Sequence, residues 1–142
     1  MKIVESDFSD QIIKFVKNQL GNIFFFNHIA VVELHEGIHF DKSNAHVIIN
    51  ELNSYFGNSQ PYGVIANRIN SYSINLLETT LYKKLAKNLF AYGVVGHDLP
   101  SKMNAEIESG FCSSEKVDYD TISEAINTVY NKIKNSGAFT LN

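Results

Sequence analysis

The sequence lacks the features that mark secreted and membrane-spanning chains. Cys112 is its only cysteine, which excludes an internal disulfide and fits a reducing compartment. No apolar run approaches the roughly 20 residues that a membrane-spanning helix needs, and the densest run, residues 23–26, has the length of a strand. The N-terminus MKIVESDFSD carries acidic residues, whereas a signal peptide has a basic flank before an apolar stretch. We therefore expect a cytoplasmic protein with no membrane span.

Basic residues are also few and scattered. The chain has 12 lysines and arginines against 15 aspartates and glutamates, a formal net charge of −3. A nucleic-acid-binding surface usually shows a basic stripe or patch. The nearest approach to one is Lys83, Lys84 and Lys87, which we interpret as the solvated face of a helix. The composition therefore argues against a nucleic-acid partner.

Length and composition fit one globular domain. The chain has 142 residues, of which 44% are hydrophobic and 19% charged, values typical of globular proteins. It contains no internal repeat, low-complexity tract or linker long enough to divide it. We predict a single domain over residues 1–142, with residues 1–20 as a lead-in segment and residues 136–142 as a C-terminal tail.

Strand-like and helix-like patterns alternate along the chain. Short β-branched and aromatic runs predict strands at 22–26, 29–34, 62–66, 89–95 and 116–119. Apolar residues at helical spacing predict helices that begin near Asp41, Asn75, Ser101 and Thr121. The first two strands, divided by Asn27-His28, predict a β-hairpin. Residues 11–20 fit either a strand or a short helix, and Leu77 and Leu85 are expected on the inner side of the second helix.

This order predicts an α/β fold with a mainly parallel sheet and an antiparallel edge, because strands that alternate with helices need parallel crossovers. We assign the aromatic residues Phe24, Phe25, Phe26, Tyr55 and Phe56 to the core. If alternate residues of the hairpin instead face outward, Phe25 would leave an exposed apolar edge suited to self-association. We therefore expect a homodimer.

Two sequence segments, ELHEGIHFD at residues 33–41 and ANRINSYS at residues 66–73, are similar to segments of a known protein family. With the element order they resemble the STAS/SEC14-type family of SpoIIAA-like proteins, specifically its short uncharacterised bacterial members, over roughly residues 20–135. The resemblance implies a STAS-like fold, with the N-terminal hairpin at the edge of a small sheet and helices packed on one face. In the anti-sigma-factor antagonists of this fold, a serine at the start of the helix after the central strand is phosphorylated and switches partner binding. Ser71 and Ser73 lie near that place.

The string His35-Glu36-Gly37-Ile38-His39 matches the zinc-protease pattern H-E-x-x-H. A zinc site requires a helix there, which places both histidines on one face with the glutamate beside a bound water. The strand-like run 29–34 leads directly into His35, and Gly37 disfavours a helix. In an extended segment the two histidines would lie about 13 Å apart, at roughly 3.3 Å per residue, although a turn at Gly37 would shorten that distance. We predict no metal, with His35, Glu36 and His39 as the alternative ligand set.

The polar stretch that follows the strand at 62–66 is the strongest candidate site. Ligands of open α/β sheets gather beyond the carboxyl ends of the strands, and a helix N-terminus favours anions. Arg68 offers a two-pronged contact to a carboxylate or phosphate, and Ser71 or Ser73 offers a hydroxyl for phosphorylation. The same residues also suit a well-built turn, with Ser73 or Asn75 capping the next helix. The binding or regulatory candidates are Asn67, Arg68, Asn70, Ser71, Tyr72 and Ser73.

A catalytic set is harder to assemble. His97 and Asp98 follow the strand at 89–95 and are secondary candidates for an acid–base pair, but no motif places a nucleophile beside them. Cys112 lacks a recognisable histidine or CxxC partner, so burial is the simpler interpretation. We predict that the protein is not an enzyme and needs no cofactor. The alternative is an enzyme that uses His97, Asp98 and Arg68.

Two functions from different classes remain. The first is a STAS-like interaction module with a regulatory protein partner, whose surface is residues 67–73. The second is a carrier for a small apolar, lipid-like ligand in a pocket between sheet and helices, which the 10 phenylalanines and 7 tyrosines suggest. The most useful observation would be whether a concave pocket opens beside Arg68 or the surface there is flat.

Overall fold

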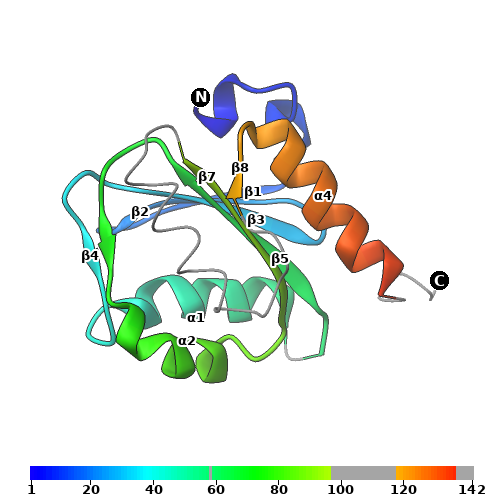
Figure 1. The fold of residues 1–142 in the computed structure, drawn as a ribbon. Helices are drawn as coiled ribbons and strands as arrows, with labels where there is room; N and C mark the ends of the chain where they lie inside the picture. The colour runs from blue at the N-terminus through cyan, green and yellow to red at the C-terminus, as the bar shows by residue number, and fades with distance from the viewer. Residues whose placement is uncertain (58, 97–117, 137–142) are drawn as a thin grey trace.

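A computed structural model describes residues 1–57, 59–96 and 118–136 of the chain (Figure 1). Within these residues, six strands form the central sheet, in the order β1-β2-β3-β5-β7-β8. They are β1 (Lys14–Lys17), β2 (Gly21–Phe25), β3 (Ile29–Leu34), β5 (Tyr62–Arg68), β7 (Leu89–Gly96) and β8 (Asp118–Tyr119). A separate parallel ribbon consists of β4 (His39–Phe40) and β6 (Ser73–Ile74).

Three α-helices accompany these strands in the described part of the chain. They are α1 (Ala45–Phe56), α2 (Thr79–Leu85) and α4 (Ile122–Asn135). Single 3₁₀ turns are η1 (Ile3–Glu5), η2 (Ser9–Gln11) and η3 (Leu76–Glu78). A search of the described residues finds no helix with the length and apolar character that crossing a membrane requires. The helix expected near Ser101 lies outside the described residues.

The sheet joins an antiparallel part to a parallel part. β1 pairs with β2 and β2 with β3 in antiparallel fashion, whereas β3, β5, β7 and β8 run parallel. The predicted hairpin around Asn27-His28 is therefore confirmed, and so is the α/β fold class with its antiparallel edge. The open choice for residues 11–20 resolves as a strand, because β1 falls within that segment. The outermost strand is thus β1, one position beyond the hairpin.

Helices cover both faces of the sheet, so the expectation that they pack on one face was wrong. Side chains alternate along a strand, and Val64 and Ala66 pack towards α1 while Ile65 packs towards α4. Figure 1 shows α1 and α2 on one side of the sheet and α4 on the other. Successive right-handed crossovers from β3 to β5 and from β5 to β7 step the same way, which places α1 and α2 together. α4 follows the last strand, has no such constraint, and covers the apolar face that would otherwise be exposed.

Phe25 lies in the core and does not form an exposed edge. Its side chain is fully buried, stacked on Tyr55 at 4.3 Å between ring centroids and edge-on to Phe56. The core assignment of Phe25 is therefore confirmed and the outward alternative is not, because α1 covers one face of the hairpin and α4 with the N-terminal turns covers the other. The exposed aromatic residue of this edge is Phe15 of β1 instead, at 52% exposure.

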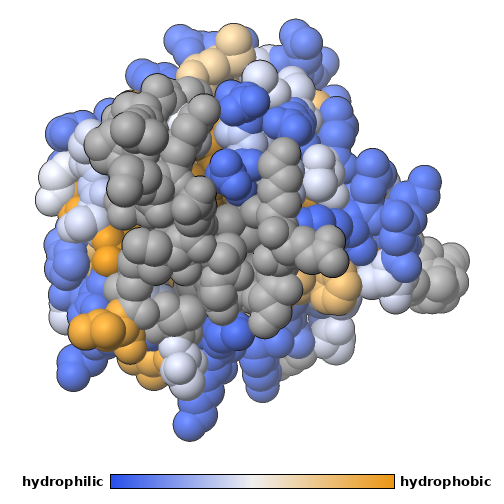
Figure 2. Space-filling model, in the orientation of Figure 1, coloured by the Kyte–Doolittle hydropathy of each residue, from blue (hydrophilic) through white to orange (hydrophobic). Residues whose placement is uncertain are grey.

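The inner side of α2 also differs from the expectation. Leu77 is 95% exposed and Leu85 40% exposed, whereas Tyr82 is buried against α1. The side chain of Asn75 accepts a hydrogen bond from the Leu77 amide and starts a 3₁₀ turn before the helix proper. Because a 3₁₀ turn has about three residues per turn, it shifts the phase of the helical pattern. Figure 2 shows the resulting hydrophobic surface at lower left, over η3 and the start of α2.

Candidate functional site

Two segments that are distant in the sequence lie side by side at the carboxyl ends of β3 and β5. β4 pairs in parallel with β6, so that His39 lies beside Ser73 and Phe40 beside Ile74. The Gly37 amide donates to the Ser71 carbonyl at 2.7 Å, and the Ser73 amide donates to the Ile38 carbonyl at 2.9 Å. We call residues 36–41 and 71–75 together the β4–β6 ridge. The two stretches that carry the family resemblance therefore form one structural unit.

The HEGIH stretch forms a turn and the start of a strand, and no helix. Gly37 has a φ of 80°, in the left-handed region that favours glycine. The Glu36 carboxylate accepts a hydrogen bond from the Ser71 amide at 2.9 Å, and His39 Nδ1 lies 2.6 Å from Ser73 Oγ. The helical geometry that a zinc site with His35, Glu36 and His39 requires is thus absent. Among the described residues, no three His, Cys, Asp or Glu side chains are grouped in a way that could hold a metal ion.

Asp41 stabilises the turn between the ridge and α1. Its carboxylate accepts hydrogen bonds from the Ser43 hydroxyl at 2.6 Å and the Ser43 amide at 2.9 Å. These hydrogen bonds, with a smaller contribution from His39, hold the pKa of Asp41 below its usual value. The Ala45 amide donates to the Asp41 carbonyl at 2.8 Å and closes a turn that comes before the helix. Helix α1 itself begins at Ala45 and not directly after Asp41 as expected.

Tyr82 supports the ridge from α2. Its hydroxyl donates towards the Asn75 carbonyl at 3.1 Å and the Phe40 carbonyl at 3.3 Å, which places it across both strands of the ribbon. Burial, followed by the nearby charges of Glu78 and Asp41, raises the pKa of Tyr82 to about 12. The hydroxyl therefore stays protonated and available as a donor at neutral pH.

Arg68 is buried and turned towards Tyr72. The side chain is 4% exposed, and its Nη2 donates to the Tyr72 carbonyl at 2.7 Å. Its guanidinium carbon lies 4.0 Å from the centroid of the Tyr72 ring, a cation–π contact. Arg68 thus fixes the position of Tyr72. The two-pronged contact to an anion stays a prediction, since it would need this arrangement to open.

The other predicted site residues are divided between two faces and the ridge. Asn67 points to the α4 face, where its amide nitrogen donates to the buried Glu33 carboxylate at 2.7 Å and to the Met1 carbonyl at 2.8 Å. Asn70 donates to the Leu34 carbonyl at 3.0 Å. Ser71 and Ser73 are exposed on the ridge. Adjacent residues of a strand face opposite sides, so Asn67 and Arg68 cannot share one site.

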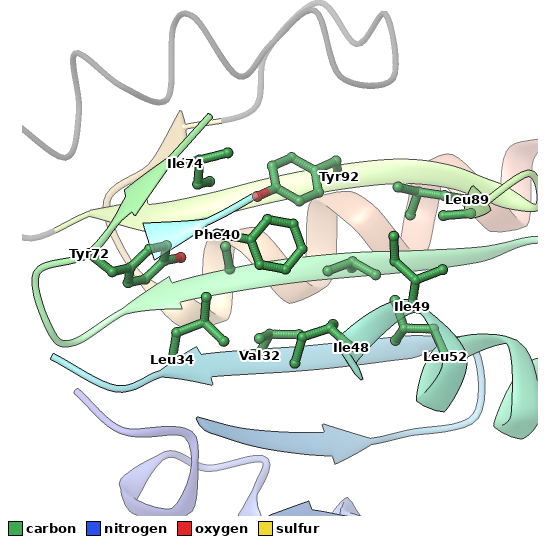
Figure 3. A pocket seen from close by; sticks show the side chains of 13 residues that line it. Val32, Leu34, Phe40, Ile48, Ile49, Leu52, Tyr72, Ile74, Leu89 and Tyr92 are labelled. Atoms are coloured by element: carbon green, nitrogen blue, oxygen red, sulfur yellow. The ribbon is translucent and has the colours of Figure 1, made fainter. Parts of the chain in front are cut away.

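An apolar cavity lies between the sheet and α1 (Figure 3), and Tyr72, the residue that Arg68 contacts, is part of its lining. Strands β3, β5 and β7 contribute one wall, α1 contributes another, and the remaining lining is Phe40, Tyr72, Ile74 and Ala86. The space open to the centres of water-sized molecules is about 70 Å³, and the total empty space including the open mouth is about 670 Å³. One water needs roughly 10–15 Å³ by the first measure, so the cavity holds more than a single solvent molecule.

Of the predicted site residues Tyr72 lines this cavity, and reasoning from the sequence missed the other lining residues. Phe40 and Ile74 point into it, as Figure 3 shows, while their neighbours His39 and Ser73 are exposed. The signal was the polar–apolar alternation in each short segment, which has the period of a strand. Segments of two residues are too short for that pattern to stand out. The secondary candidates His97 and Asp98, and also Cys112, lie outside the described residues.

Comparisons with known proteins agree with the fold and leave the function open. No family model matches the sequence, and no curated protein matches it. Among solved structures, the chain is similar to an uncharacterised protein of the DUF3478 family with a SpoIIAA-like fold, from Shewanella loihica PV-4. The identity is 11%, the TM-score is 0.52, and the match covers 82% of this chain and 90% of that chain. The SpoIIAA-like fold that the sequence resemblance implied is therefore confirmed, and this likeness extends to the fold alone.

Proposed function

We propose that this SpoIIAA-like domain is a non-enzymatic binding domain that takes a small apolar, lipid-like group into the cavity between the sheet and α1. The cavity itself is the observation that carries this proposal. Protein interiors are close-packed and contain few voids larger than a water molecule. An apolar hollow with room for more than one water is therefore better explained by a ligand than by imperfect packing.

The lining and size of the cavity define the ligand class. The walls are aliphatic and aromatic, and the hydroxyl-bearing side chains among them are Tyr72 and Tyr92. The enclosed space of about 70 Å³ is smaller than the roughly 300–1,000 Å³ of pockets that bury drug-sized ligands. The expected ligand inserts a short alkyl chain or a single ring, and its remainder occupies the open mouth.

A pair of alanine-to-leucine variants tests the cavity. Ala66 lines it from β5, and the added side chain of Ala66→Leu should fill it with little change in the free energy of unfolding. Ala91 is buried on the opposite face, against α4, and Ala91→Leu should lose about 1–3 kcal/mol because that side is packed. Chemical denaturation of both variants and the wild type measures the difference.

The same pair tests binding. Titration with 1-octanol and octanoate, followed by ¹⁵N NMR, should shift cavity amides in the wild type and in folded Ala91→Leu. Ala66→Leu should bind at least about tenfold more weakly, a loss of roughly 1.4 kcal/mol or more. Unchanged binding by Ala66→Leu, together with destabilisation equal to that of Ala91→Leu, would remove the cavity as a ligand site.

A second candidate function, a regulatory protein-interaction module, is favoured by the setting of Ser71. Its side chain is exposed, while its backbone is held by the Glu36 carboxylate and the Gly37 amide. A phosphate adds about 1.5–2 negative charges at neutral pH, and here it would stand beside Glu36 and repel it. The Ser73 hydroxyl is already in contact with His39, so Ser71 is the better candidate for a switch.

Quantitative affinity capture with three baits tests this module. The baits are the wild type, Ser71→Asp, and Ser54→Asp as a matched control on the exposed surface of α1. A regulatory partner should change its recovery at least about tenfold with Ser71→Asp, and remain unchanged with Ser54→Asp. Identical recovery with all three baits would count against a switch at Ser71.

A further inference from the structure

β1 presents an open strand edge. It is the terminal strand of the sheet, and in the described residues it pairs with β2 alone. Asn18 and Gly21 exchange backbone hydrogen bonds at 3.0 and 3.3 Å and close the β1–β2 hairpin. Because inward and outward groups alternate in an antiparallel ladder, Lys14 and Val16 direct their amides to β2. The backbone groups of Phe15 and Lys17 then face outward, where they can template a further strand.

The side chains of this edge are partly apolar. Phe15 is 52% exposed and Ile13 is 55% exposed. The Phe15 ring stacks on Phe24 at 4.9 Å between centroids, which places it on the α4 face of the sheet. Ile13 lies two residues earlier and shares that face. Lysines usually protect an edge strand from pairing, and β1 carries Lys14 and Lys17, but an exposed phenylalanine at its centre works against that protection.

We propose that a second copy of this chain pairs with β1 in an antiparallel register centred on Phe15. This register places Phe15 opposite Phe15 of the second copy, Ile13 opposite Lys17, and Lys14 opposite Val16. The outward-facing amide and carbonyl of Phe15 then meet those of Phe15 in the second copy, while the Ile13 amide stays bonded to the Phe25 carbonyl of its own chain at 2.8 Å, and no lysine lies opposite a lysine. The two copies use the same surface, as a closed twofold dimer requires.

Other symmetric registers are less favourable. Centring the pair on Lys14 or Lys17 brings two like charges directly opposite, which is destabilising. Centring it on Val16 places Phe15 against Lys17 and leaves Ile13 outside the pairing. The dimer is independent of the proposed function, because Phe15 lies on the α4 face and the cavity lies on the α1 face.

Cysteine cross-linking tests the register. In a Cys112→Ser background, Phe15→Cys should form a disulfide-linked dimer under mild oxidation. Opposed residues of a hydrogen-bonded antiparallel pair lie about 5.5 Å apart between Cα atoms, within the range of roughly 4.4–6.8 Å that disulfides span. Val16→Cys is the matched control and should stay unlinked, since it faces Lys14 of the second copy. Equal or faster cross-linking through Val16→Cys would overturn the register.

Sedimentation velocity tests the association without a covalent bond. A short edge pairing gives a weak complex, so the wild type should show a dimer over about 10–500 µM. Lys17→Pro removes an outward-facing donor and leaves the β1–β2 ladder intact, so it should raise the dimer dissociation constant at least about tenfold. Lys17→Ala should dimerise like the wild type. A monomeric wild type over this range, or a Lys17→Pro variant that dimerises equally well, would contradict the proposal.

Discussion

Replacing Gly21 by alanine is expected to abolish stable folding. Gly21 opens β2 at a φ of 155°, a backbone conformation that side-chain-bearing residues rarely adopt. An added Cβ would lie 2.4 Å from the Glu33 carbonyl oxygen and 2.6 Å from the Leu34 Cα. Both atoms belong to the backbone of β3, so no side-chain movement relieves the clash. We expect a loss of about 4 kcal/mol or more, a large share of the roughly 5–15 kcal/mol that stabilises a typical domain.

Gly57→Ala is the matched control for this prediction. Gly57 follows α1 with a φ of 82°, but an added Cβ there would have no neighbour within 4 Å. Its substitution should cost about 1–3 kcal/mol from conformational strain alone, because its ψ of −168° puts it in a region that essentially only glycine adopts. Circular dichroism and urea denaturation compare the two variants. If Gly21→Ala were no less stable than Gly57→Ala, the close approach of β2 to β3 at this point would be refuted.

The second large effect is expected at Glu33, a buried acid in an otherwise apolar strand. The side chain is 3% exposed, and its Oε2 accepts hydrogen bonds from the Ile3 amide and the Asn67 side chain, each at 2.7 Å. Glu33→Ala would remove the acceptor of both donors. A buried donor left without an acceptor costs about 1–3 kcal/mol, so we expect a total loss of about 3 kcal/mol. Urea denaturation measures this loss, and hydrogen exchange should show faster opening at the Ile3 amide.

Glu33→Gln separates the shape of this contact from its charge. The glutamine carbonyl oxygen can take the place of Oε2 and accept from both donors. We expect it to recover most of the stability lost in Glu33→Ala, within about 1 kcal/mol of the wild type. Equal stability of the alanine variant and the wild type would show that Glu33 does not fasten the N-terminal segment to β3.

Regular periodicity explains what was predictable in the fold. Runs such as IAVVEL at residues 29–34 are apolar without interruption because β3 is covered on both faces, and they identified the strands directly. The helix start predicted at Thr121 is confirmed: its side chain accepts from the Glu124 amide at 3.1 Å at the start of α4, and the Glu124 carboxylate accepts from the Asp120 amide at 3.1 Å. The apolar stripe of α4 was equally clear, but a stripe does not specify which face of the sheet it covers. The sequence therefore did not predict which face of the sheet α4 covers.

The candidate site was predictable in part. Placing a site at the carboxyl end of β5 depended on a general rule of α/β sheets, and of the residues predicted there Tyr72 lines the cavity. The pairing of Glu36 with Ser71 was not predictable, because these residues are 35 positions apart and meet only when β3 and β5 are neighbours in the sheet. A single sequence carries no direct signal of that adjacency. The buried contact between Glu33 and Asn67 could not be predicted from the sequence for the same reason.

The end of β5 also determines where this chain tolerates changes in length. Side chains at the end of β5 alternate between the two faces of the sheet: Ala66 and Arg68 point to the face covered by α1, and Asn67 points to the face covered by α4. A one-residue insertion or deletion earlier in β5 would move each of them to the opposite face. The Arg68 guanidinium would then enter the apolar side of the sheet that α4 covers. Asn67, whose side chain donates to the Met1 carbonyl, would face the side that holds the cavity. One codon gained or lost at this point would disrupt both layers at once. Laboratory evolution by insertion or deletion should therefore recover functional variants on either side of this strand end and almost none within it.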